Sequence, residues 1–116
     1  MDLSALTAIS PIDGRYRSQL QHLDYYFSEY ALIRFRLLVE IEYFIALSEK
    51  KFFTLRPAQL KPLREIYLNF TPEKAADIKN MEKVTNHDVK AVEYYIKKDD
   101  RPCKCNCLYC SDISCY

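Results

Sequence analysis

The chain has 116 residues, of which 49% are hydrophobic and 28% charged, the balance of one soluble globular domain with a modest core. The sequence contains 17 Lys and Arg residues and 16 Asp and Glu residues, so the formal net charge is only +1. This charge gives no electrostatic case for a nucleic-acid or membrane-surface partner.

Several other classes are disfavoured by simple patterns. No hydrophobic run approaches the length of a bilayer span, and the N-terminus lacks the basic start and apolar stretch of a signal peptide. We therefore expect a cytoplasmic protein without a membrane partner. The only glycine of the sequence is Gly14, which argues against tight β-hairpins and glycine-rich phosphate loops.

The predicted elements begin with an irregular arm over residues 1–16, in which Pro11 and Gly14 turn the chain. A short helix can follow at 17–23. The strongest helix is predicted for 28–51, with Ser28 as its N-cap. Apolar residues lie on nearly every side of this helix, which favours burial on more than one face, for example against other subunits.

Three further helices follow in the sequence. The first, at about 57–70, contains Pro62, which either starts or bends it. In the second, Thr71 is the expected N-cap and Pro72 the first helical residue. The third begins within "VTNHDVKAVEYYIKK", where Thr85 or Asn86 can provide the cap. The sequence therefore predicts an all-α body.

Arg36 and Glu40 are four residues apart on the long helix and can pair across one turn. Two polar stretches are candidates for chemistry. In "DGRY", Arg15 can fork onto a carboxylate or phosphate and Tyr16 adds a hydroxyl. From the residues alone, an ordinary turn with a surface Arg and a packing Tyr is the preferred interpretation, because short motifs are weak signals.

The second stretch is "TNHD", at a predicted helix start, where backbone N–H groups favour anions. His87 can donate a hydrogen bond to an anion or move a proton near neutral pH, and Asp88 could hold its tautomer. The simpler interpretation is a capping sequence with an exposed histidine.

All five cysteines lie in the last 16 residues, at Cys103, Cys105, Cys107, Cys110 and Cys115. Thiolates at this spacing can bind zinc or copper(I), but no second CxxC pair or nearby histidine completes a zinc finger. We interpret 1–99 as a helical domain and 100–116 as a cysteine-rich tail, a disordered or alternative ending outside the helical fold. Metal or disulfide use of the cysteines remains the alternative.

Three stretches follow one another along the chain: "LTAISPIDGRY", "FSEYALIRFRLLVEIEYF" and "KVTNHDVKAVEYYIK". Together they resemble the N-terminal domain of adenylosuccinate lyase, in the fumarase/aspartase superfamily. The resemblance covers about residues 3–98. It implies the all-α N-terminal domain of that fold, ending before the central helical bundle. It also implies a homotetramer, with active sites at a junction of three subunits, and no cofactor or metal.

The resemblance implies the elimination of fumarate from adenylosuccinate, giving AMP, and from the succinylated carboxamide ribonucleotide of purine synthesis. By the same resemblance, Arg15 and Tyr16 contact the nucleotide. Asn86, His87 and Asp88 form the helix-start triplet at the substrate, where His87 orients or polarises it.

The family's general-acid histidine and general-base serine lie in later regions that are not found in this sequence, and His22 does not match that histidine. We therefore expect the chain alone to have no lyase activity. Two alternatives remain: a short isoform that docks onto full-length subunits as a regulatory module, and a small metal-binding protein that uses its cysteine tail.

Overall fold

The computed structural model of the chain describes residue 2 and residues 4–99, so the cysteine tail predicted at 100–116 lies outside the described residues. Within the described part every regular element is a helix, which confirms the all-α prediction. None of the described helices combines the length and the apolar character needed to cross a membrane. The elements are η1 (Arg17–Gln19), η2 (Gln21–Leu23), α1 (Asp24–Phe27), α2 (Glu29–Glu49), α3 (Pro57–Leu68), α4 (Pro72–Thr85) and α5 (Asp88–Asp99).

The chain divides into two compact units, which meet in sequence within α2. We call Met1–Leu32 the N-terminal unit and the part that begins at Ile33 the helical unit. The N-terminal unit contains the arm, η1, η2 and α1, and the helical unit contains most of α2 and all of α3, α4 and α5.

Backbone turns and one charged cluster organise the N-terminal unit. The Gly14 N–H donates to the Ser10 carbonyl at 3.0 Å. The Arg17 guanidinium lies 3.4 Å from the Asp13 carboxylate and 2.7 Å from that of Asp24. The short helix expected at 17–23 is present as two 3₁₀ turns, and no residue of η1, η2 or α1 is buried.

The start of α2 follows the sequence prediction closely. The Ala31 N–H donates to the Ser28 Oγ at 3.1 Å, so Ser28 caps the helix as expected. At the other end the helix stops at Glu49, two residues before the predicted boundary, and Lys51 takes a left-handed conformation with φ 66°. This conformation ends the helix and turns the chain.

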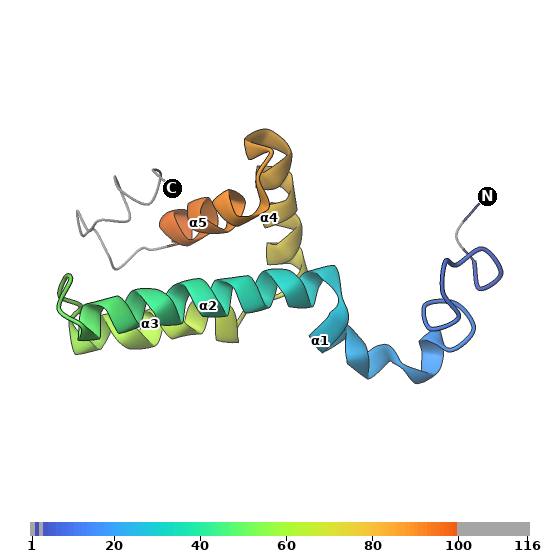
Figure 1. The fold of residues 1–116 in the computed structure, drawn as a ribbon, viewed down its shortest axis with the longest axis horizontal. Coiled ribbons are helices and arrows are strands. Elements are labelled where there is room, and N and C mark those ends of the chain that lie inside the picture. The colour runs from blue at the N-terminus through green and yellow to red at the C-terminus, as the bar shows by residue number, and fades with distance from the viewer. Residues whose placement is uncertain (1, 3, 100–116) are drawn as a thin grey trace. The chain divides into compact units, whose positions relative to one another are not determined.

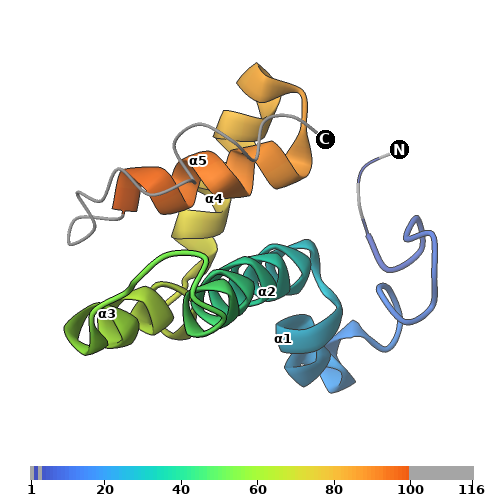
Figure 2. The same ribbon diagram turned by 60° about the vertical axis from the view of Figure 1, so that its left-hand side comes forward.

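Helices α2 and α3 lie side by side, and α4 leads away from this pair before α5 turns back (Figures 1 and 2). The Glu42 carboxylate connects α2 to α3. It accepts hydrogen bonds from Arg64 Nε at 2.8 Å, Arg64 Nη2 at 3.0 Å and the Tyr67 hydroxyl at 2.8 Å. Pro62 lies inside α3, which begins at Pro57, so Pro62 does not start the helix.

The core of the helical unit receives buried side chains from α2, α3, α4 and α5. Four large side chains are less than 2% exposed, and they are Leu37 and Ile41 of α2, Ile78 of α4 and Val92 of α5. Pro72 is the first residue of α4, as predicted, but the Thr71 side chain makes no capping hydrogen bond. The Thr71 side chain instead hydrogen-bonds to Glu73 and is the main cause that lowers the pKa of the Glu73 carboxyl.

Candidate functional site

The "TNHD" stretch forms the corner between α4 and α5. Thr85 is the last residue of α4, and Asn86 follows in a left-handed conformation, with φ 52° and ψ 30°. The Asn86 N–H donates to the Glu82 carbonyl at 2.7 Å and closes the helix. The expectation that Thr85 or Asn86 caps the next helix is therefore wrong, because both residues end the preceding one. Asparagine suits this position because its short polar side chain tolerates the left-handed region.

His87 provides the cap of α5 instead. Its Nδ1 accepts a hydrogen bond from the Lys90 backbone N–H at 3.2 Å, in the first turn of the helix. A ring nitrogen that accepts an N–H carries no proton, so the neutral ring is protonated on Nε2. The His87 side chain is 64% exposed, so Nε2–H is available as a donor to a ligand.

The Asp88 carboxylate has two partners other than the histidine. Its Oδ1 accepts the Val89 N–H at 2.8 Å, and its Oδ2 lies 2.7 Å from Arg36 Nη2. The Val89 N–H is the main cause that lowers the pKa of the Asp88 carboxyl, and Arg36 adds to the effect. Oδ1 lies 3.8 Å from His87 Nδ1, so the tautomer is set by the Lys90 N–H rather than by Asp88.

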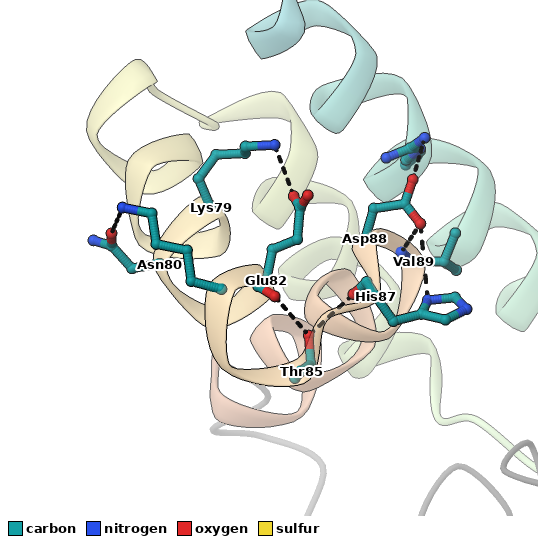
Figure 3. Close-up of polar contacts among 9 residues, drawn as sticks. Lys79, Asn80, Glu82, Thr85, His87, Asp88 and Val89 are labelled. Atoms are coloured by element: carbon teal, nitrogen blue, oxygen red, sulfur yellow. Dashed lines mark hydrogen bonds and ion pairs between the residues drawn. The ribbon is translucent and has the colours of Figure 1, made fainter.

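A surface pocket of about 540 Å³ opens at this corner, and Figure 3 shows most of its residues. It is lined by Lys79, Glu82, Lys83, Asn86, His87 and Asp88. Lys79 pairs with the Glu82 carboxylate at 2.8 Å, and Lys83 Nζ lies 3.4 Å from Asn80 Oδ1. Two ammonium groups, a ring N–H and an amide give the pocket donors for an anionic ligand, and the carboxylates of Glu82 and Asp88 line it as well.

The two lysines were missed in the sequence analysis. Lys79 and Lys83 are four residues apart on α4, so they lie on one face of the helix, and Lys83 precedes Asn86 by three residues. This spacing could have placed them beside the corner. The expected partner of Arg36 was Glu40, whereas the structure shows an ion pair between Arg36 and Asp88.

The other predicted pair, Arg15 and Tyr16, lies in the N-terminal unit. The Arg15 guanidinium carbon lies 5.3 Å from the centre of the Tyr16 ring, a cation–π distance. Both side chains are exposed, and the Tyr16 N–H donates to the Pro11 carbonyl at 2.9 Å. The structure thus brings Arg15 to Tyr16 and, in the helical unit, Asn86 to His87 and Asp88.

No group of three His, Cys, Asp or Glu side chains that could hold a metal ion occurs among residues 2 and 4–99. The cysteines considered as possible metal ligands are outside this range.

Comparison with known proteins gives a consistent result. Matches named adenylosuccinate lyase include proteins of Dictyostelium discoideum (56% identical over 105 residues), Legionella pneumophila strain Corby (50% over 101) and Escherichia coli strain K12 (44% over 102). This chain is homologous to the N-terminal segment of adenylosuccinate lyases.

Each of the three alignments covers 84% of this chain and 22% of the relative, so the chain spans about a fifth of the length of these adenylosuccinate lyases. No protein-family model matches the chain. The resemblance predicted from the three quoted stretches is confirmed by these identities.

Proposed function

We propose that this chain supplies the nucleotide-binding N-terminal part of an adenylosuccinate lyase. The whole enzyme eliminates fumarate from adenylosuccinate, giving AMP, and from the succinylated carboxamide ribonucleotide. The observation that carries the proposal is the 41–56% identity to proteins of this name over 84% of the chain.

The geometry of the corner supports an anion-binding role within that reaction. The substrate carries a phosphate and two carboxylates, and the elimination builds negative charge on one carboxylate. His87 offers Nε2–H to the pocket, and Lys83 adds a positive charge beside Asn86. The ammonium group of Lys79 is paired with Glu82 and adds a donor at the rim. We assign Asn86, His87 and Asp88 to nucleotide binding. We make the same assignment for Arg15 and Tyr16, without placing them in one pocket with the first group.

We assign neither the general acid nor the general base to this chain. Removal of the proton beside the carboxylate and protonation of the departing nitrogen each need a positioned group. His87, whose Nδ1 is engaged by Lys90, is assigned to orient the substrate. The 116-residue chain alone is therefore expected to release no fumarate.

A chimera tests this proposal. Residues 1–99 replace the matching segment of the Dictyostelium discoideum relative, and fumarate release is measured for the chimera and for its His87→Ala variant. The chimera should retain activity within about tenfold of the parent, and the variant should lose at least about a hundredfold. A folded chimera without activity, or a variant with full activity, would contradict the proposal.

A second candidate function is a docking module for full-length subunits, favoured by one face of α2. Phe35, Val39 and Tyr43 repeat every four residues and are 38%, 60% and 58% exposed. An apolar stripe at helical spacing fits the apolar face of another helix. In the family-like assembly that we propose, a homotetramer, this face would lie against other helices of the enzyme.

Co-purification distinguishes the two candidates. A tagged chain is expressed with the full-length Dictyostelium relative, alongside a Val39→Glu variant and an Ala76→Glu control, which places the same charge on an exposed site of α4. Docking through α2 predicts that Val39→Glu alone abolishes recovery of the full-length protein. Equal recovery with all three chains would reject docking through this face.

A further inference from the structure

The ion pair between Arg36 and Asp88 connects two helices that are far apart in the sequence. Arg36 lies in the second turn of α2, and Asp88 is the first residue of α5. Their side chains are 28% and 42% exposed, and Arg36 Nη2 approaches Asp88 Oδ2 to 2.7 Å. This contact ties the start of α5 to α2.

The same carboxylate stands next to the histidine that we assign to the substrate. Asp88 Oδ1 lies 3.8 Å from His87 Nδ1, the ring nitrogen that accepts the Lys90 N–H (Figure 3). A carboxylate only accepts hydrogen bonds, so Asp88 can bind Nδ1 of the neutral ring only if the proton moves there from Nε2. Asp88 and the Lys90 N–H therefore favour opposite tautomers of His87.

We propose that Arg36 is a positioning residue: it holds Asp88 away from the ring, so that His87 keeps its proton on Nε2 and presents it to the pocket. Its role in catalysis rests on the proposed function of His87, but the tautomer that it selects does not. Nothing in the motifs or the comparisons assigns a role to Arg36.

Other charges around the corner do not replace this contact. Lys79 is paired with Glu82, and Lys90 Nζ lies 2.8 Å from the Glu93 carboxylate. Among the ion pairs of the described residues, only that of Arg36 involves Asp88 Oδ2. Loss of the Arg36 guanidinium would leave Asp88 with the Val89 N–H and the neighbouring imidazole as its nearest partners.

The experiment uses the full 116-residue chain, labelled with ¹⁵N, at a pH high enough to deprotonate the ring. The ring nitrogen shifts of His87 give the tautomer ratio, and hydrogen exchange reports on the Lys90 N–H. In Arg36→Gln the fraction of Nδ1–H should rise at least about threefold and the Lys90 amide should exchange at least about threefold faster, changes of the size of one partly exposed ion pair.

Arg64→Gln is the matched control, because Arg64 also forms an ion pair between α2 and a later helix, with Glu42 at 2.8 Å. Arg64→Gln should lower the free energy of unfolding about as much as Arg36→Gln does, and it should leave the His87 tautomer unchanged. Arg36→Lys should restore part of the wild-type ratio, because it keeps a cation near Asp88.

The double variant Arg36→Gln/Asp88→Asn keeps the proposal testable if the single variant folds poorly. Without the carboxylate, the ring should return to the Nε2–H form. An unchanged tautomer in Arg36→Gln, an equal change in Arg64→Gln, or no return in the double variant would overturn the proposal. No nucleotide is used, so an inactive chimera would reject the proposed function and leave this result intact.

Discussion

Four large side chains of the helical unit are less than 2% exposed, whereas η1, η2 and α1 of the N-terminal unit contain no buried residue. Both units carry candidate site residues. His87 lies on a corner between helices that share a hydrophobic core, and Arg15 lies on a loop held by backbone turns and exposed ion pairs.

The two groups of candidate residues are therefore supported by structures of different stability. Several apolar side chains of the N-terminal unit are exposed, including Leu6 at 98% and Phe27 at 84%. Surface ion pairs such as that of Arg17 with Asp24 contribute little to stability. We infer that the helical unit folds through its own core, whereas the arm and short helices of the N-terminal unit have little buried apolar surface to stabilise them.

The difference in stability between the two units is tested most strongly by truncating one apolar side chain in each. Leu37→Ala removes a fully buried side chain of α2 and should lower the free energy of unfolding by about 2–5 kcal/mol. Phe27→Ala removes a larger but exposed side chain and should change it by no more than about 0.5 kcal/mol. Urea denaturation followed by circular dichroism measures both values. A large loss for Phe27→Ala would show a core that includes the N-terminal unit.

A smaller effect is expected at the helix corner. Asn86 has φ 52°, and a β-branched residue is strained in this region, so Asn86→Val should lower stability by about 1–2 kcal/mol. Asn86→Gly keeps the backbone conformation and should change stability by only a few tenths of a kcal/mol.

The two Asn86 variants also separate structure from function when placed in the chimera. If Asn86→Gly is stable but inactive, the amide side chain acts on the substrate. If it is stable and active, the residue serves only to end α4, and its assignment to the nucleotide site would be withdrawn.

The contact of α2 with α3 should make the stability of the helical unit modestly dependent on pH. Hydrogen bonding by Arg64 is the main cause that lowers the pKa of the Glu42 carboxyl below its ordinary value. A lowered native pKa stabilises the fold above the pKa of the unfolded chain, and this contribution is lost as the pH falls through the native value.

Glu42→Gln should therefore narrow the difference in stability between neutral and acidic pH by up to about 1 kcal/mol, the scale of a partly exposed ion pair. Glu49→Gln, at the exposed end of the same helix, is the control and should leave the pH dependence unchanged. Urea denaturation across the acidic range measures the effect. An identical pH dependence in wild type and Glu42→Gln would contradict this interpretation.

The elements that local chemistry determines were predicted well. Ser28 caps α2, and Pro72 begins α4, because each signal acts within one turn of its own helix. The order of the helices followed from the same signals and from apolar spacing.

The errors occur where a distant group competes for a side chain. Arg36 has a possible partner one turn away in Glu40, but the packing of α5 against α2 brings Asp88 to it. His87, rather than Thr85, caps α5 because α4 continues to Thr85 and Asn86 turns the chain. The partner of Arg36 cannot be obtained from sequence spacing, because it depends on how helices pack. The lysines of the pocket, in contrast, could have been found from their spacing along α4.

The smallest effect on stability is expected at Gly14, where only the N-terminal unit should respond. A Cβ added there would lie 2.8 Å from the Ala5 carbonyl oxygen and 2.9 Å from the Ala8 Cβ, closer than packed atoms approach. In Gly14→Ala the turn must therefore shift, and with it the adjoining Arg15 and Tyr16. Amide chemical shifts should change over residues 4–17.

The helical unit should keep its unfolding free energy within about 0.5 kcal/mol in this variant, because its core is built from its own side chains. Ser18→Ala, at an exposed position of η1, is the control and should change few shifts. If Gly14→Ala destabilised the helical unit or shifted amides around His87, the two units would be energetically coupled. The loop of Arg15 would then be supported by the helical core. The contrast between the supports of Arg15 and His87 would be wrong.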